Sequence, residues 1–149
     1  MSDPWRTCCT LAAALAVLSA GPRLEGSQAE QDESKRPEIT VRVTPPTGFT
    51  PLRVRASADL RDGSDDYAEY YCATVEWDWG DGTISQHTSD CDPYEAGESE
   101  IQRRFRADHV YRQAGAYRIA FRLKQKTRQV GGGVASVQVR SGAGEGFGR

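Results

Sequence analysis

Apolar and polar residues alternate in several short runs between residues 38 and 140 of this chain. A period of two is typical of half-buried β-strands, because successive side chains of a strand point to opposite faces. The clearest run is 117–124, in which aromatic and aliphatic residues alternate with Arg118, Arg122 and Lys124. The other runs are 39–43, 52–60, 75–79, 101–111 and 135–139. None of them has a convincing helical period.

Turn-forming residues separate these runs. Pro45–Gly48 is expected to end the first run, Asp62–Asp66 to form a loop, and Gly131–Gly133 to break the chain before the last strand. Asp81 and Gly82 follow the run 75–79 and predict a hairpin, because glycine accepts a positive φ and aspartate tolerates it. Six or seven short strands in roughly 100 residues predict an antiparallel β-sandwich.

Four bulky residues supply the inner side chains that a two-layer core needs: Trp77, Trp79, Tyr117 and Phe121. Hydrophobic residues make up 38% of the chain and charged residues 27%, which fits one globular domain with flexible ends. No internal repeat is visible, and this argues against a solenoid or a propeller.

The first apolar stretch, residues 7–20, is too short to cross a membrane, which takes about 20 residues. Its length and the small residues after it predict a signal peptide over residues 1–29, cleaved after Ala20 or after Ala29. The alternatives are an uncleaved N-terminal anchor and a misassigned start codon. We therefore expect an exported protein, periplasmic or extracellular, without a transmembrane span after cleavage.

Composition divides the rest of the chain into three parts. Residues 30–37 are polar and predict a flexible leader, and residues 141–149 are rich in glycine and predict a flexible tail. The folded body is expected to run over residues 38–140. Arginine outnumbers lysine by 16 to 3, and this usage favours a GC-rich and hence bacterial genome.

Two of the four cysteines, Cys8 and Cys9, lie inside the expected signal peptide. Cys72 and Cys91 remain, and an even count in an exported domain predicts one disulfide, with two unpaired thiols as the alternative. Closing a loop of about 20 residues stabilises a fold by about 3 kcal/mol, mainly by restricting the unfolded chain. Two cysteines are too few for a structural zinc site, and neither histidine completes a ligand spacing.

Two motifs, in this order, resemble the signatures of PKD domains. Residues 77–83, Trp-Asp-Trp-Gly-Asp-Gly-Thr, look like the first signature, and a segment about 25 residues later resembles the second one. The segment 44–52 is similar to the opening of the family, so the resemblance covers nearly all of the body. The motif residues are Trp77, Asp78, Trp79, Gly80, Asp81, Gly82, His109, Tyr111, Gly115 and Tyr117.

This resemblance implies an immunoglobulin-like β-sandwich of an extracellular or cell-envelope protein. Members of the family usually serve as interaction or spacer modules and carry no catalytic machinery of their own. The segments 64–73 and 86–100 look longer here than in a minimal member. They hold both remaining cysteines, so the disulfide is expected to be a local addition, and the family does not say what these insertions do.

Charge is distributed unevenly, although the formal net charge is only −2 and gives no global positive field for nucleic acid. Residues 59–100 contain 13 acidic residues against one arginine, and residues 103–128 contain nine basic residues against one aspartate. Pairing between strands would cancel much of this charge. If the charges stay apart, Arg118, Arg122 and Lys124 form a basic face for an anionic polymer such as lipopolysaccharide or an acidic glycan.

The loop residues Asp62, Asp65 and Asp66 are weak candidates for binding calcium, which takes six to eight oxygen ligands. They lack the loop pattern of a specific site, and most acidic loops are simply solvated. No other cofactor or metal is expected.

Asp78 and Asp81 could form a catalytic carboxylate pair. Carboxylates at a hairpin turn more often bond their own backbone, however, and no nucleophile elbow or phosphate-loop motif occurs in the sequence. We therefore expect no enzyme, with a metal-dependent or small hydrolase as a remote alternative.

Tyr67, Tyr70, Tyr71 and Tyr94 lie in the two insertions that the disulfide would hold together. Aromatic side chains on a tied loop offer a large contact area at a low entropy cost, and they predict a contact patch. The alternative is that they cover an edge of the sandwich. The predicted function is non-catalytic binding of an envelope or extracellular protein or glycan, and the alternative function is a structural spacer or assembly component without a specific ligand.

Overall fold

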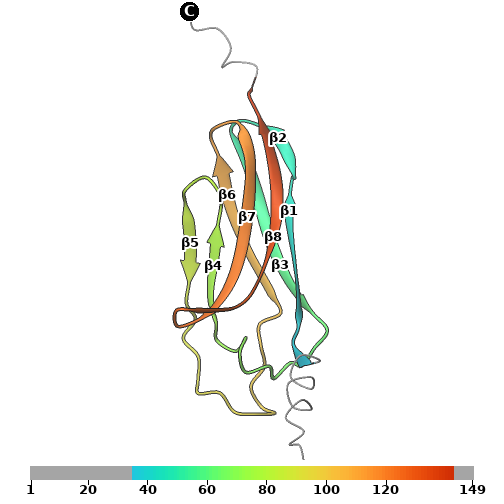
Figure 1. Cartoon of the computed structure of the whole chain (residues 1–149), viewed down its shortest axis with the longest axis vertical. Helices are drawn as coiled ribbons and strands as arrows, with labels where there is room; N and C mark the ends of the chain where they lie inside the picture. Colours follow the sequence, from blue (N-terminus) through green and yellow to red (C-terminus); the bar gives the residue numbers. More distant parts are fainter. Residues whose placement is uncertain (1–34, 143–149) are drawn as a thin grey trace, which may run out of the picture.

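The alternation of apolar and polar residues produces eight β-strands in two facing sheets within residues 35–142, the part of the chain that the computed structural model describes (Figure 1). The three-stranded sheet has the order β1-β3-β6, with β1 (Glu38–Thr44), β3 (Leu52–Arg61) and β6 (Arg104–Tyr111). The five-stranded sheet has the order β2-β8-β7-β4-β5, with β2 (Thr47–Phe49), β8 (Arg128–Arg140), β7 (Gly115–Gln125), β4 (Thr74–Asp78) and β5 (Ile84–His87).

The pairing of the strands confirms the predicted antiparallel β-sandwich. Within the described residues all neighbouring strands are antiparallel except β2 and β8, which run parallel over three residues. The first strand of one sheet therefore continues, after the prolines Pro45 and Pro46, into an edge strand of the other sheet. The segment that was expected only to break the first strand thus includes a short strand of its own.

Aromatic side chains from both sheets fill the core. Trp79 and Phe121 are 0% and 1% exposed, and Trp77 is 3% exposed, as the sequence predicted. The Phe121 ring lies 4.8 Å from the Trp77 ring in the same sheet and 5.3 Å from the Phe105 ring in the opposite sheet, measured between centroids. Tyr117 is only partly buried, and its ring stacks on Tyr111 at the margin of the core.

The three glycines Gly131–Gly133 lie inside β8, so the expectation that they break the chain is wrong. The turn is made earlier, at Lys126 and Thr127, where Lys126 has a φ of 56°. Gly131 and Gly133 allow a close approach of β1 and the Tyr70 segment: a Cβ on Gly131 would lie 2.7 Å from Tyr70 Oη and 2.8 Å from Ile39 Cδ1. Glycine therefore occurs here because β1 and the Tyr70 segment pack directly on β8.

The two insertions lie at one end of the sandwich (Figure 1). The predicted disulfide is confirmed: Cys72 and Cys91 are bonded, with their Cα atoms 6.1 Å apart. The backbone of Ile101 also donates a hydrogen bond of 2.8 Å to the carbonyl oxygen of Asp65. As a result the strand-like segment expected from residue 101 begins only at Arg104, because the preceding residues belong to this end structure.

The expected signal peptide, most of the leader and most of the glycine-rich tail lie outside the described residues. The last leader residues are packed on the body, since Pro37 is buried and Arg36 donates hydrogen bonds to Tyr70 Oη at 3.0 Å and to the carbonyl oxygen of Val130 at 2.5 Å. Residues 35–142 include no helix that has the length and apolar character needed to cross a membrane.

Candidate functional site

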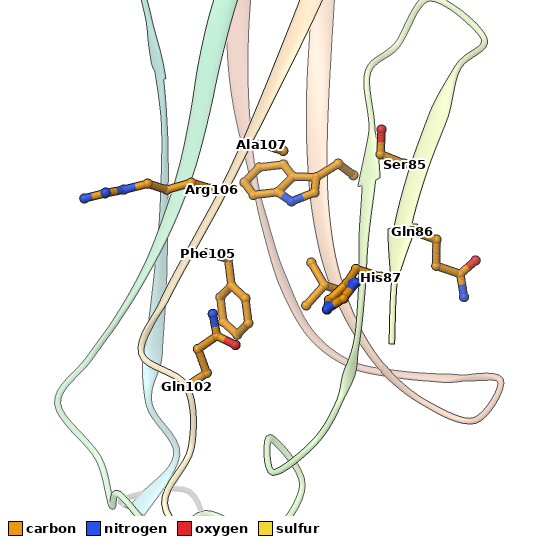
Figure 2. A pocket seen from close by; sticks show the side chains of 9 residues that line it. Ser85, Gln86, His87, Gln102, Phe105, Arg106 and Ala107 are labelled. Atoms are coloured by element: carbon orange, nitrogen blue, oxygen red, sulfur yellow. The ribbon is translucent and has the colours of Figure 1, made fainter. Parts of the chain in front are cut away.

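A groove of about 230 Å³ opens between the edge strands β5 and β6, on the side where the two sheets do not meet (Figure 2). Its floor is apolar and consists of Val75 and Trp77 from β4 and Phe105 and Ala107 from β6. Its rim is polar and consists of Ser85, Gln86 and His87 from β5 and Gln102 from the segment before β6.

The open side exists because β5 is a short edge strand that is exposed at all four residues. β6 is the edge strand of the opposite sheet, and no described strand pairs with its outer side. Phe105 reaches from β6 to the core while the Arg106 guanidinium extends away from the groove, as alternation along a strand requires (Figure 2). The groove therefore offers an aromatic floor between two unpaired strand edges.

Hydrogen bonds within the turn at residues 79–83 position β5 beside the floor of the groove. The backbone amide and the hydroxyl group of Thr83 donate hydrogen bonds to Asp81 Oδ1 at 3.0 and 2.6 Å, and the Trp79 amide donates to the Thr83 carbonyl oxygen at 3.1 Å. Gly80 has a φ of 76°, and a Cβ there would lie 2.7 Å from the backbone oxygen of Arg118. The predicted hairpin is thus confirmed, and Trp79 Nε1 anchors β5 by donating to Ser85 Oγ at 2.9 Å.

Residues of the two PKD-like motifs hold the two sheets together through side-chain contacts. The His109 ring of β6 stacks on Trp79 at 4.6 Å, and its Nε2 lies 2.7 Å from Asp81 Oδ2. The Tyr111 hydroxyl donates to the backbone oxygen of Trp79 at 2.8 Å, and burial raises the pKa of this hydroxyl, so it stays a donor at neutral pH. These contacts explain the motif as a structural device that joins β6 to the β4–β5 hairpin.

The carboxylates of Asp78 and Asp81 also have structural partners within the fold. Asp78 Oδ1 accepts from the Gly80 amide at 3.1 Å, and its Oδ2 accepts from Arg122 at 3.1 Å. Burial opposes the ionisation of Asp81, but hydrogen bonds from Thr83 and His109 outweigh it and lower the pKa of this carboxyl. The Asp81 carboxyl therefore lacks the raised pKa that a general acid needs.

The four predicted contact tyrosines separate into two pairs. Tyr67 and Tyr70 are 7% and 4% exposed and pack edge to face in the core, so the prediction of a surface role for them is wrong. The physical reason is that Tyr70 fills the space above Gly131. Tyr71 and Tyr94 lie together near the surface with ring centroids 5.5 Å apart, and Tyr94 is 38% exposed.

The predicted basic face of Arg118, Arg122 and Lys124 does not form as a positive surface. Glu76 is 6% exposed and lies between two of these residues, since its Oε1 accepts from Arg122 at 2.9 Å and its Oε2 from Lys124. Asp78 adds a second ion pair to Arg122 at 3.1 Å. Cross-strand pairing therefore cancels the charge of Arg122 and Lys124, while Arg118 is exposed.

The acidic loop residues are held by protein partners. Asp65 pairs with Arg103 at 2.6 Å, and Asp66 accepts a hydrogen bond from Ser64, which is the leading cause of its lowered pKa. Among residues 35–142 no three metal-ligating side chains converge. Calcium binding at Asp62, Asp65 and Asp66 stays a prediction from the sequence.

The groove residues were not identified as a site from the sequence. Phe105 and Ala107 lie in a run that alternates, so the sequence predicts their burial but not an opening beside them. Ser85–His87 carries no motif at all, and its place at an edge is set by the order of the strands. The one signal in the sequence was the hairpin turn that precedes this segment.

Comparisons with known proteins show similarity to solved structures at low sequence identity. No family model matches this chain, and no curated protein matches it. Among solved structures, the PKD domain of an M14-like peptidase from a Thermoplasmatales archaeon is similar, with 15% identity and a TM-score of 0.47, over 71% of this chain and 97% of that one. The alkylpurine DNA glycosylase AlkC of Pseudomonas fluorescens, solved with DNA containing an abasic site analog, has 14% identity and a TM-score of 0.40, over 76% of this chain and 34% of that one.

The class of protein follows from the strands themselves. Two facing sheets of antiparallel strands, joined by an aromatic core and crossing from one sheet to the other after the first strand, make this chain an immunoglobulin-like β-sandwich.

Proposed function

We propose that this protein is a non-catalytic binding module of the PKD type, which holds an envelope or extracellular partner in the groove between β5 and β6. The observation that carries the proposal is the groove itself, with its aromatic floor between two strand edges. The PKD assignment is supported by the roles of the motif residues, because His109 of the second motif contacts both Trp79 and Asp81 of the first.

The chemistry of the groove favours an extended segment of a protein or glycan. Apolar ring faces such as Trp77 and Phe105 take an apolar side chain or the flat face of a sugar. The amide and imidazole groups of Gln86, His87 and Gln102 offer hydrogen bonds at the rim. The edge of β5 can also add an extended peptide by main-chain hydrogen bonds.

Export and the absence of catalysis belong to the same proposal. The confirmed disulfide supports an oxidising compartment, outside the cytoplasm. The engaged carboxylates Asp78 and Asp81 support a structural role for the hairpin turn rather than hydrolysis.

A photoreactive amino acid in place of Gln86 would test the groove in the native host of the protein. We expect irradiation to capture one partner at this position and not at Ser136, an exposed residue on the outer face of β8. Filling the floor by Ala107→Trp should abolish the capture while the disulfide and the unfolding midpoint stay intact. Equal capture at both positions, or none at Gln86, would reject the groove and favour a spacer.

A further inference from the structure

The outer face of the three-stranded sheet is rich in arginine. On β3 the residues in even positions are buried, so the alternating ones point to solvent. Antiparallel pairing then places outward residues of β1 and β6 beside them. The basic residues of this face are Arg42, Arg53, Arg55, Arg61, Arg104 and Arg106, and its acidic residues are Glu38, Asp59 and Asp108.

A hollow of about 450 Å³ lies at the centre of this face. In the register of the sheet, Ser57 has Arg42 on one side and Arg106 on the other. Because serine is small, the longer side chains of Arg55 and Arg104 also stand around the hollow. Figure 2 shows the Arg106 guanidinium turned to this side of β6 and away from the groove.

The charges on this face do not cancel. Arg55 pairs with Asp108 at 2.9 Å, and Arg104 pairs with Asp59 at 2.9 Å, with Arg42 3.7 Å from the same aspartate. These pairs hold their guanidinium groups in place beside the hollow. Arg106 has no ion pair or hydrogen bond from its side chain within residues 35–142, and it lines the hollow directly.

We propose that this arginine face binds a linear acidic glycan, with its carboxylate or sulfate groups at Arg106 and its hydroxyl groups at Ser57 and the face's aspartates. Guanidinium forks match planar oxyanions in two-point contacts. Outward residues recur about every 7 Å along a strand, and strands lie about 5 Å apart, so the cations form a grid that suits a polymer more than one small anion.

Asp59 and Asp108 should favour acidic glycans over other polyanions. Asp59 and Asp108 are hydrogen-bond acceptors on the same face as the arginines. An acidic glycan brings hydroxyl groups that can donate to them beside its anionic groups, whereas polyglutamate and the backbone of duplex DNA bring anionic groups without hydroxyl donors. No aromatic side chain lies on the outward positions of β1, β3 or β6, so single-stranded nucleic acid would find no stacking platform there.

Calorimetry of the full chain, with its disulfide intact, at about 0.15 M salt tests this proposal. The probes are heparin as a sulfated glycan, polygalacturonate as a carboxylated glycan and dextran as a neutral one. We expect binding to one or both acidic glycans, weaker at higher salt, and none to dextran. The absence of binding to both acidic glycans, or binding of polyglutamate or duplex DNA as tight as that of the glycans, would overturn the proposal.

Substitutions place the binding on this face. Arg106→Ala should lower the affinity for the acidic glycan roughly tenfold, and Ser57→Ile should fill the hollow and lower it as strongly. Arg140→Ala is the matched control, because it removes the same charge from an exposed strand position on the opposite sheet. Equal losses in Arg106→Ala and Arg140→Ala, with unchanged unfolding midpoints, would show a non-specific charge effect and reject the face. The groove variant Ala107→Trp should leave glycan binding unchanged, so the two proposals fail separately.

Discussion

The two sides of the sandwich differ in how the sheets are held. On the side of β1 and β8 the sheets touch, because Gly131 and Gly133 leave room for Ile39, Val41 and Tyr70. On the side of β5 and β6 no described strand bridges the two sheets, and Trp77 and Phe105 lie at the bottom of the groove between them. The disulfide ties the loops before β4 and after β5, on this open side.

This difference shows which side of the β-sandwich is suited to a binding site. The closed side is stabilised by packing, and its residues are not free to bind anything else. The open side leaves two strand edges unpaired within the described residues, above a floor of nearly buried aromatic rings, and the disulfide ties its loops together. The following predictions, from the largest expected effect to the smallest, test this contrast.

Removing the disulfide should have the largest effect. The double substitution Cys72→Ser and Cys91→Ser opens a loop with a sequence separation of 19 residues. We expect the free energy of unfolding to fall by about 3 kcal/mol, because the unfolded chain gains entropy. Urea unfolding measures this loss, and hydrogen exchange should show faster opening at β5 than at β1. Equal opening of both strands would contradict the contrast between the sides.

A larger side chain between β1 and β8 should lower the free energy of unfolding slightly less than the loss of the disulfide. Gly131→Val forces side-chain atoms against Tyr70 and Ile39, which a Cβ already approaches at 2.7 and 2.8 Å. Overpacking of this kind should lower the free energy of unfolding by about 1–3 kcal/mol. Val134→Ala on the same strand is the control, since Val134 is 50% exposed and should change little. A neutral Gly131→Val variant would show that the two sheets do not meet there.

The ion pairs of Glu76 with Arg122 and Lys124 should make the free energy of unfolding depend on pH. The Lys124 hydrogen bond is the largest influence on the Glu76 carboxyl, followed by the opposing effect of burial and by Arg122, and together they lower its pKa from 4.5. The unfolded chain then binds more protons than the folded one below about pH 4.5, so stability falls as the pH falls through this window.

Glu76→Gln isolates this effect. At neutral pH we expect a loss of about 1–2 kcal/mol, since the substitution removes the charge between two partly exposed cations. Below about pH 4.5 the difference from the native chain should shrink as the pH falls, because the Glu76 carboxyl is protonated first in the unfolded chain and, at still lower pH, in the folded one. Unfolding midpoints measured between pH 3 and 7 decide this, and a difference that is constant over the whole range would contradict the assigned role of Glu76.

The smallest effect is expected from the exposed edge. Ile84→Thr on β5 should change the free energy of unfolding by less than about 0.5 kcal/mol, because Ile84 is 60% exposed. The matched change Val41→Thr on β1 should cost more, because Val41 packs against the core next to Gly133. Thermal unfolding compares the two variants, and a larger loss in Ile84→Thr would mean that β5 is covered in the free protein.

The outer faces of the two sheets show why a run of charges in the sequence does not locate a basic surface. Arg122 and Lys124 alternate in the clearest strand, yet the register of β4 brings Glu76 and Asp78 beside them. Arg106 lies opposite Ser57 and keeps its charge. A shift of two residues in the pairing of β3 with β6 would place Arg106 opposite Asp59, and alternation alone does not reveal the register.

Local rules of the chain determined most of the strands, though not β2, together with the hairpin at Asp81 and Gly82, the buried Trp77, Trp79 and Phe121, and the pairing of two cysteines that are near in sequence. Each of these depends on neighbours within a few residues or on the simple count of cysteines. The tertiary structure alone decided that Gly131 lies within a strand, that Tyr70 is buried, and that the groove and the arginine face exist. Those features depend on which strands lie side by side and on how closely the sheets approach, and such long-range contacts are not written in any single segment.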